Sequence, residues 1–260
     1  MKILLSMEGV AKSFGGNHVL QGVDAAVREG EIVGLLGPNG SGKSTLLNLA
    51  TGFARLDRGA IRMDGARIDA LPTHRIIERG IARTFQLPSM PTRMSVLEVA
   101  MSASLSHHGF WATLLCPPAA RAAEADARRR AGALLDELLL ARVRDLPASA
   151  LSGGQKKLLG IACALMRRPR LLMLDEPTAG VHPGLRGEIA AVLRRLRDEG
   201  MTLVVVEHDM AFVREVCTRC VVLDRGRVAA DCRPDELAGH PRVLEAYLGQ
   251  SAAAPHREAA

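Results

Sequence analysis

Aromatic residues are scarce in this sequence, at 3% of its 260 residues. Proteins that bind single-stranded nucleic acid commonly stack the bases on aromatic rings, so this scarcity argues against such a platform. Apolar residues still make up 48% of the chain, which is enough for a substantial core built mostly from Leu, Val, Ile, Ala and Met. The length fits one large domain, or a core domain with a smaller insertion.

Long apolar segments are also absent. No run approaches the ~18 residues that span a bilayer, and the N-terminal stretch MKILLSMEGVAKSF lacks the apolar core and cleavage site of a signal peptide. We therefore expect a chain that is soluble by itself and reaches any membrane through a partner. The formal net charge of +6 is modest, and the densest basic run, Arg128 to Arg130, favours a solvated helix face over a patch for an anionic partner.

Cysteine is sparse, and its pattern is incomplete for a metal site. Cys217 and Cys220 form a lone C-x-x-C among five cysteines, with no second pair and no nearby histidine to complete a four-ligand zinc set. The pair falls where a helix is expected to give way to a strand, so buried structural thiols are favoured over metal or redox use. Free thiols in an odd number suit a reducing cytosol.

The pattern of apolar residues predicts an α/β fold with an inserted helical part. The first part of the chain is typical of short strands and turns, whereas residues 95–168 are almost entirely helical in pattern. Strands then alternate with helices, which predicts a mixed or parallel sheet covered on both faces. We expect strands at 31–36, 61–63, 81–85, 171–175 and 201–207, helices at 44–50, 72–79, 119–140 and 184–199, and hairpin turns at 64–65 and 224–226.

A glycine-rich loop follows the first buried strand. Gly37 to Thr45 matches the pattern G-x-x-x-x-G-K-[ST], and a helix is expected to begin at its end. Glycine lets the backbone N–H groups approach phosphate oxygens, and the positive end of the helix adds to the attraction. We expect Lys43 to reach the β- and γ-phosphates and Ser44 to ligate Mg²⁺. The predicted phosphate-binding residues are Gly37, Pro38, Asn39, Gly40, Ser41, Gly42, Lys43, Ser44 and Thr45.

Two acids end the strand at 171–175. Asp175 and Glu176 follow four apolar residues, and the carboxyl end of such a strand is where α/β sheets bind ligands. We predict that Asp175 holds Mg²⁺, directly or through water, and that Glu176 acts as general base for the attacking water.

A third motif precedes the helix that is expected to run to about Arg167. Ser152 is suited to cap this helix, and Gly153 and Gly154 allow a ligand to approach the backbone before Gln155. The chain therefore carries two different phosphate-binding surfaces but one complete phosphate loop. The economical interpretation is a head-to-tail pair of chains, in which each completes the other's site.

The string L-S-G-G-Q between the two nucleotide motifs resembles the signature of ABC ATPases, and the resemblance covers residues 4–250. It implies an ABC cassette with an N-terminal antiparallel β part, a single domain over 1–250, a helical subdomain at about 90–168 and a tail at 251–260. It also implies that Phe14 stacks on adenine, that Gln86 links Mg²⁺ and the attacking water to the helical subdomain, and that His208 contacts the γ-phosphate. The chain departs from the family where His182 replaces the usual Asp of S-A-L-D.

Several strings resemble the larger ATPase subunit of branched-chain amino acid importers. They are S-F-G-G at 13–16, G-I-A-R-T-F-Q at 80–86, L-S-G-G-Q-K-K-L-L at 151–159 and V-L-E-A-Y-L-G at 243–249. The resemblance implies ATP and Mg²⁺ as cofactors, a place at the cytoplasmic face of the cell membrane, permease subunits, a second ATPase subunit that is a paralogue or a second copy, and indirectly a periplasmic binding protein. Urea or amide importers and lipopolysaccharide exporters share parts of these strings.

Other functions stay open at this stage. A soluble ABC ATPase that acts on DNA or ribosomes usually has tandem cassettes or long coiled coils, and a P-loop GTPase has an N-K-x-D string; this sequence has none of these. We therefore expect no nucleic-acid partner. The apolar segment at 107–118, with Phe110 and Trp111, favours a core role over a groove for a membrane subunit.

Overall fold

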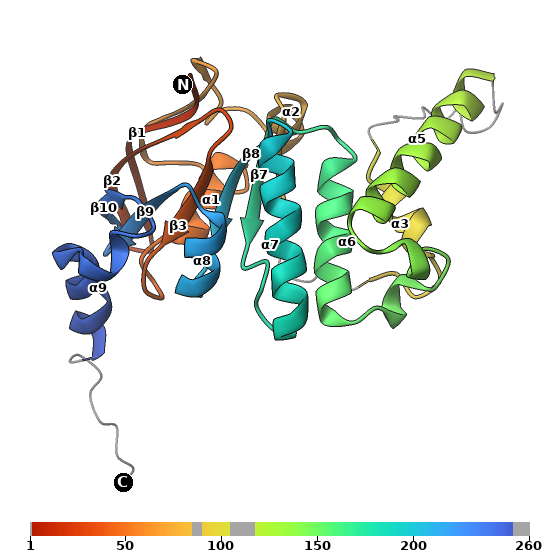
Figure 1. Ribbon diagram of the computed structural model, residues 1–260. Helices are drawn as coiled ribbons and strands as arrows, with labels where there is room; N and C mark the ends of the chain where they lie inside the picture. The colour runs from red at the N-terminus through yellow and green to blue at the C-terminus, as the bar shows by residue number, and fades with distance from the viewer. Residues whose placement is uncertain (1, 85–89, 105–117, 252–260) are drawn as a thin grey trace, which may run out of the picture.

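The computed structural model describes residues 2–84, 90–104 and 118–251. The segments that contain Gln86, Phe110 and Trp111 lie outside these ranges, and so does most of the predicted tail. Two sheets and the helices around them make up the described part, and the helical portion lies at the end of the molecule opposite α9 (Figure 1).

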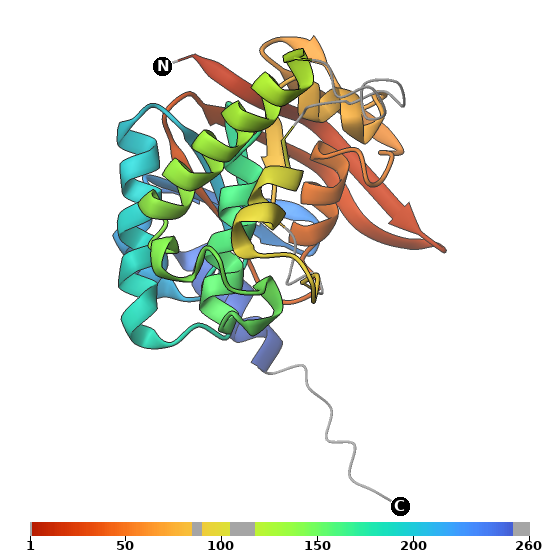
Figure 2. The same cartoon turned by 90° about the vertical axis from the view of Figure 1, so that its right-hand side faces the viewer.

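The first sheet is antiparallel and is built largely from the N-terminal strands. Its order is β2-β1-β4-β5, and Figure 2 shows β1 and β2 as one long hairpin. The prediction of short strands is wrong for this hairpin, because β1 and β2 each run for 12 residues. Repeated register shifts between the two strands interrupt the alternation of side chains, and such shifts make one long strand look like several short ones in sequence. The strands are β1 (Ile3–Phe14), β2 (Asn17–Arg28), β4 (Arg58–Met63) and β5 (Ala66–Arg67).

The second sheet carries the motifs. Its order is β10-β9-β3-β8-β7-β6, and five of the six strands run parallel, whereas β10 pairs with β9 in the antiparallel sense. The predicted mixed sheet of an α/β fold is therefore confirmed. The strands are β3 (Ile32–Leu36), β6 (Ile81–Arg83), β7 (Leu171–Asp175), β8 (Thr202–Val206), β9 (Arg219–Asp224) and β10 (Arg227–Cys232).

Both faces of this sheet are buried. Along β3, Ile32 and Leu36 belong to one hydrophobic cluster, whereas Val33 and Leu35 belong to the other. The first cluster is shared with α6 (Gly153–Leu165), α7 (Pro183–Asp198) and α8 (Met210–Val216), and the second with α1 (Lys43–Ala50) and the antiparallel sheet. Because alternate side chains of a strand point to opposite faces, a strand covered on both sides is a continuous apolar run, as the sequence has it.

The regular elements described between residues 96 and 165 are all helices. They are α3 (Val96–Ser102), α5 (Pro118–Glu137), α6 and the short turns η1 (Ala141–Val143) and η2 (Ala148–Ala150). The helix predicted over 119–140 ends earlier, because Leu139 has a left-handed backbone with φ 61° and the Leu140 amide closes the end by donating to the Leu135 carbonyl. The remaining helices are α2 (Thr73–Glu78), η3 (Leu237–Gly239) and α9 (Pro241–Ser251).

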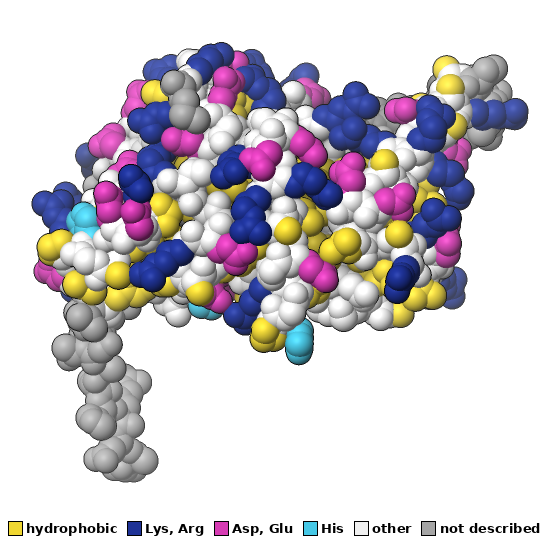
Figure 3. All heavy atoms as spheres, in the orientation of Figure 1, with side chains coloured by type: hydrophobic (Ala, Val, Ile, Leu, Met, Phe, Trp, Pro, Cys, Tyr) yellow, Lys and Arg dark blue, Asp and Glu magenta, His cyan; other side chains and the backbone are white. Residues whose placement is uncertain are grey.

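The basic run on α5 is engaged within the chain. Arg129 pairs with Asp126 at 3.1 Å, and Arg130 donates to the Leu165 carbonyl at the end of α6. Figure 3 shows basic and acidic side chains mixed over the visible face, without a continuous field of one sign. Arg130 thus stabilises the C-terminal end of a neighbouring helix, as cationic side chains commonly do.

The two cysteines of the C-x-x-C string were expected to be buried. Cys217 and Cys220 are buried, at 8% and 0% exposure, and both sulfur atoms lie against Gly34 of β3. The prediction of buried thiols is confirmed.

No helix in the described ranges is both long enough and apolar enough to cross a membrane.

Candidate functional site

The strand order brings the predicted site residues to one edge of the parallel sheet. Residues 37–42 follow β3, and Glu207 and His208 follow β8. Asp175 is the last residue of β7, and Glu176 comes directly after it. These three strands are consecutive neighbours in the sheet, and β6 lies next to β7. Since the carboxyl ends of parallel strands share one edge, segments far apart in sequence meet there.

The glycine-rich loop leaves no room for side chains at two of its glycines. Gly37 has φ 140°, and a Cβ atom there would lie 2.1 Å from the Leu223 carbonyl oxygen. Gly42 has φ 105°, and its Cβ would lie 2.5 Å from the Leu20 side chain. Both glycines are required by their backbone conformation and by β9 and β2 packing against the loop.

The loop and the start of α1 fit a phosphate group. Helix α1 begins at Lys43 and has no side-chain capping bond at its N-terminal end, so N–H groups of its first turn point outward without a side-chain acceptor. The Ser41 hydroxyl is buried and, among the described residues, has no hydrogen-bond partner. A phosphate oxygen would supply the missing acceptors, and the positive end of the helix would favour its charge.

Lys43 lies folded over the loop. Its Nζ donates to the carbonyl oxygens of Gly37 at 2.7 Å and Pro38 at 2.9 Å. Burial lowers the pKa of Lys43 below its usual value, and the negative charges of Glu176 and Asp175 partly oppose this effect. The ammonium group is therefore held between the loop and the two acids, where a bound triphosphate would meet it.

Two of the three predicted metal ligands, Ser44 and Asp175, lie within the described residues. Asp175 is 9% exposed at the end of β7, and Ser44 is exposed in the first turn of α1, whereas Gln86 lies outside the described residues. Carboxylate and hydroxyl oxygens are ligands that Mg²⁺ accepts in proteins. The donor types of Ser44 and Asp175 therefore fit the expected ion.

Glu176 has a backbone conformation that is uncommon for a residue with a side chain. Its φ is 48°, its N–H donates to the Val206 carbonyl at 2.9 Å, and its own carbonyl accepts from the Lys157 ammonium. Positive φ at such a residue is maintained only when surrounding contacts hold it. Here β8 and α6 both contribute, so the direction of the Glu176 side chain is fixed from two elements.

A buried acid that the sequence analysis did not single out connects this region to His208. Glu207 is 1% exposed and accepts from the amide and hydroxyl of Thr178 at 2.8 and 2.6 Å. It also accepts from the His208 amide at 3.2 Å, while the His208 side chain is 67% exposed. Glu207 thus ties the segment after Glu176 to the backbone of His208. Its place directly before a histidine at a strand end is the signal that could have found it.

The signature segment forms a complete helix cap. The Ser152 hydroxyl accepts from the Gln155 amide at 3.3 Å, and the Gln155 side chain accepts from the Ser152 amide at 3.0 Å, which confirms Ser152 as N-cap of α6. Gly154 packs closely against α7, because a Cβ atom there would lie 2.2 Å from the end of the Leu185 side chain, which would have to shift. Gly153 is exposed. No hydrogen bond or ion pair within the described ranges joins this segment to the loop at 37–45.

Phe14 lies at the tip of the β1–β2 hairpin. It is 51% exposed, and the Lys12 ammonium lies 5.1 Å from the centre of its ring. The same hairpin contributes Val19 and Leu20, which contact the loop at Gly42. An exposed ring on an element that packs against the phosphate loop is suited to stack on a flat ligand.

His182 has a local structural role. It is the N-cap of α7, where its Nδ1 accepts from the Gly184 amide at 3.2 Å and Pro183 occupies the first turn. Asp and Asn are the usual residues at such a position because their side chains accept this bond. The imidazole replaces that function, which explains how the departure from the family pattern is tolerated in the fold.

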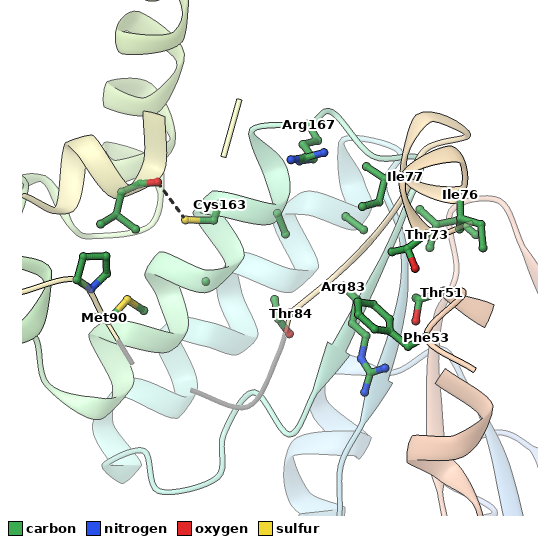
Figure 4. Close-up of a pocket in the computed structure, with 16 residues that line it drawn as sticks. Thr51, Phe53, Thr73, Ile76, Ile77, Arg83, Thr84, Met90, Cys163 and Arg167 are labelled. Atoms are coloured by element: carbon green, nitrogen blue, oxygen red, sulfur yellow. Dashed lines mark hydrogen bonds between the residues drawn. The ribbon is translucent and has the colours of Figure 1, made fainter. Parts of the chain in front are cut away.

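An apolar cavity of about 360 Å³ lies beside the sheet edge. In Figure 4, Met90 and Cys163 lie on one side, Thr51, Phe53 and Ile76 lie on the other, and Thr84 lies between them. The helical portion and the N-terminal portion of the chain therefore both contribute walls. Phe53 is 55% exposed there. The other residues that line the cavity are Thr73, Ile77, Ile81, Ala82, Arg83, Pro91, Val99, Gly160, Ala164 and Arg167.

Comparisons with known proteins agree on one family. The family model described as ABC transporter matches residues 20–179. The chain is 38% identical over 251 residues to the high-affinity branched-chain amino acid transport ATP-binding protein BraF of Pseudomonas aeruginosa, which covers 95% of this chain and 98% of that protein. It is 34% identical over 252 residues to the LivG protein of the same description from Escherichia coli K12, again over 95% and 98%.

A protein of another transport system is also similar. The lipopolysaccharide export system ATP-binding protein LptB of Haemophilus influenzae is 33% identical over 247 residues, or 95% of this chain and 98% of that protein. Among solved structures, a nucleotide-free ATP-binding cassette of an ABC transporter has a TM-score of 0.83 at 32% identity, over 94% of this chain and 98% of that one. A cassette in its ADP conformation has a TM-score of 0.81 at 32% identity, over 96% and 100%.

Proposed function

The chain belongs to the ABC transporter family, and from that membership we propose that it binds and hydrolyses ATP to energise uptake of branched-chain or related amino acids. The observation that carries the substrate class is the 38% identity to a branched-chain amino acid transport ATP-binding protein along nearly the whole length of both chains. The loop at 37–45 and the acids at the end of β7 supply the groups that the chemistry needs.

The residues of the sheet edge divide the work of hydrolysis. The N–H groups of the loop bind phosphate oxygens, and Lys43 neutralises charge on the terminal phosphates. Ser44 and Asp175, with Gln86, would hold Mg²⁺, which supplies charge neutralisation on the phosphates when bound. Glu176 orients the attacking water and accepts its proton, and His208 lies on the next strand end, positioned through Glu207.

Two chains are needed for a complete site. Each chain has one phosphate loop and one signature segment, and within the described part of this chain no hydrogen bond or ion pair joins the two. In the proposed dimer, the exposed backbone of Ser152 and Gly153 contacts the ATP held by the partner. The second chain is a paralogous ATPase or another copy of this one.

The cavity between the helical and N-terminal portions is the proposed contact for a permease subunit. Its lining is mostly apolar and includes the exposed Phe53, while Arg167 adds a cation among the lining residues. An apolar helix end with an acidic or carbonyl group toward Arg167 is complementary to it. A chain bound there works at the cytoplasmic face of the membrane, and a periplasmic binding protein would act through the permease.

A second candidate is favoured by one observation. The similarity to a lipopolysaccharide export ATP-binding protein is close to that of the importer subunits, at 33% identity. The same ATPase chemistry would then power export, and urea or amide import is a further variant of the import proposal.

ATPase measurements in reconstituted vesicles test the proposal. The subunit is assayed alone, with the membrane subunits, and with a binding protein loaded with a branched-chain amino acid, an amide or urea. We expect weak hydrolysis alone, more with the membrane subunits, and a further rise with a branched-chain ligand. Equal rates in all arms would overturn the importer assignment. Stimulation only by lipopolysaccharide would favour the exporter.

A further inference from the structure

Arg83 makes a buried ion pair with one of the predicted metal ligands. Its Nη2 lies 2.8 Å from Oδ2 of Asp175, and the two side chains are only 7% and 9% exposed. Its Nη1 donates to Oδ1 of Asn48 at 2.6 Å. One guanidinium therefore connects three elements, because Arg83 ends β6, Asp175 ends β7 and Asn48 lies on α1.

The geometry of this contact fixes the direction of the carboxylate. A guanidinium is planar and donates along fixed directions, so holding it at Asn48 also determines where its other nitrogen meets Asp175. The hydrogen bond engages Oδ2 of Asp175, and the carboxylate has a second oxygen at a fixed angle to the first. The Asp175 amide also donates to the hydroxyl oxygen of Thr84, the residue after Arg83, at 3.4 Å. The end of β6 therefore orients the end of β7.

We propose that Arg83 is a positioning residue for the divalent cation: it holds Asp175 through Oδ2 and presents Oδ1 to the ion or to a water bound to it. The proposal rests on the proposed function only in placing a nucleotide-bound Mg²⁺ near Asp175. Groups that orient a metal ligand by hydrogen bonding typically change metal affinity by 10- to 100-fold when they are removed. Removal of the Arg83 guanidinium is expected to weaken cation affinity by an amount within that range.

Two physical effects of Arg83 have opposite signs. If it orients Asp175, its removal weakens cation binding. If its charge competes with the cation for the carboxylate, its removal strengthens cation binding. The contact to Asn48 favours orientation, because the guanidinium that donates to Oδ2 of Asp175 is also anchored on α1.

The test measures cation affinity directly. Mn²⁺ replaces Mg²⁺ at oxygen ligands and is followed by electron paramagnetic resonance, with the chain saturated by a non-hydrolysable ATP analogue. Arg83→Met is expected to raise the Mn²⁺ dissociation constant by about 10- to 100-fold. Arg83→Lys keeps a charge but cannot donate to Asp175 and Asn48 in one plane, and its dissociation constant is expected between those of Arg83→Met and the unmodified chain.

A matched control removes a comparable arginine elsewhere. Arg219 is 15% exposed and pairs with Glu31 at 3.0 Å, on the β9 side of the sheet. Arg219→Met is expected to lower the unfolding temperature and leave Mn²⁺ affinity unchanged. If Arg83→Met does not fold, the Mn²⁺ affinities of Arg83→Lys and Asn48→Ala test the proposal instead. Asn48→Ala frees the guanidinium from its anchor and is therefore also expected to weaken Mn²⁺ binding.

The outcomes separate this inference from the proposed function. An unchanged or tighter Mn²⁺ affinity in the folded Arg83 variants overturns the positioning role. An equal loss in the Arg219 variant shows a general structural effect and also overturns it. If the unmodified chain binds neither the analogue nor Mn²⁺ with it, the nucleotide-site assignment itself is wrong.

Discussion

The phenol oxygen of Tyr247 accepts a hydrogen bond from the backbone N–H of Gly37 at 3.0 Å. The two residues are 210 positions apart; one lies on the C-terminal helix α9, and the other begins the phosphate loop. Gly37 is buried, so its N–H is hydrogen-bonded to this side chain instead of to water. Helix α9 therefore supports the loop from outside the site.

Tyr247→Phe tests that support. The variant keeps the ring but leaves the buried Gly37 N–H without its acceptor, which is expected to cost about 1–3 kcal/mol of unfolding free energy. We also expect weaker ATP binding, because the start of the loop loses a fixed point. Urea unfolding and titration with a fluorescent ATP analogue measure the two effects. Leu244→Ala, at an exposed position of the same helix, is the control; equal behaviour of both variants would contradict the role of the phenol.

Glu176→Gln is expected to separate ATP binding from hydrolysis. The amide cannot accept the proton of the attacking water, whereas the loop that binds the phosphates is untouched. Unhydrolysed ATP would then hold two chains together, and size-exclusion chromatography with Mg-ATP is expected to show a dimer. The double variant with Lys43→Ala is expected to elute as a monomer. A single variant that stays monomeric at high concentration would count against the ATP-bridged dimer.

Ser152→Arg distinguishes a site made by one chain from a site made by two. Ser152 is exposed and caps α6, and an arginine there is expected to block the partner's nucleotide and remove most ATPase activity. Mixed with Lys43→Ala, each mixed dimer keeps one intact site, so activity is expected to return in part. Full activity of Ser152→Arg alone, or no recovery on mixing, would contradict a contribution in trans.

Gly160→Phe tests the cavity as the permease contact. Gly160 is a cavity-lining residue on α6, and a Cβ atom there would meet nothing within 4 Å, so a ring can extend into the cavity without strain in the chain. We expect normal ATP binding by the isolated subunit and loss of co-purification with the membrane subunits. Gly187→Phe, on α7 and equally open, is the matched control. Undiminished co-purification of the Gly160 variant would place the permease elsewhere.

Alkylation of Cys163 reports on the same cavity through its pH dependence. Burial raises the pKa of the Cys163 thiol to about 11. Since only the thiolate reacts, the rate is expected to keep rising between pH 9 and 11, whereas a thiol of pKa about 8.5 has levelled off. Brief iodoacetamide pulses followed by peptide mapping measure this rate, with the urea-unfolded chain as control. A plateau below pH 9 in the folded chain would contradict the burial effect.

Local features of the fold were predictable because they depend on neighbours in the chain. The Ser152 cap, the strand at 171–175 and the turn at Asp64 and Gly65 all follow from residue types a few positions apart. The turn residues have φ 54° and 78°, as the tight hairpin requires. The predicted element lengths were wrong where strand register or a single backbone dihedral determined them. Strands β1 and β2 are longer than expected, and Leu139 ends a helix early.

The sequence by itself determined the chemistry of the loop at 37–45 and of the acids at 175–176, because covalent geometry holds the members of each motif together. Only the tertiary structure decided that β7 lies between β6 and β8, and that order creates the contacts the sequence analysis missed. Arg83 reaches Asp175 across 92 positions, and Glu207 reaches Thr178 across 29. Such pairs depend on strand order and packing, and the residue types alone do not specify which distant strand ends become neighbours.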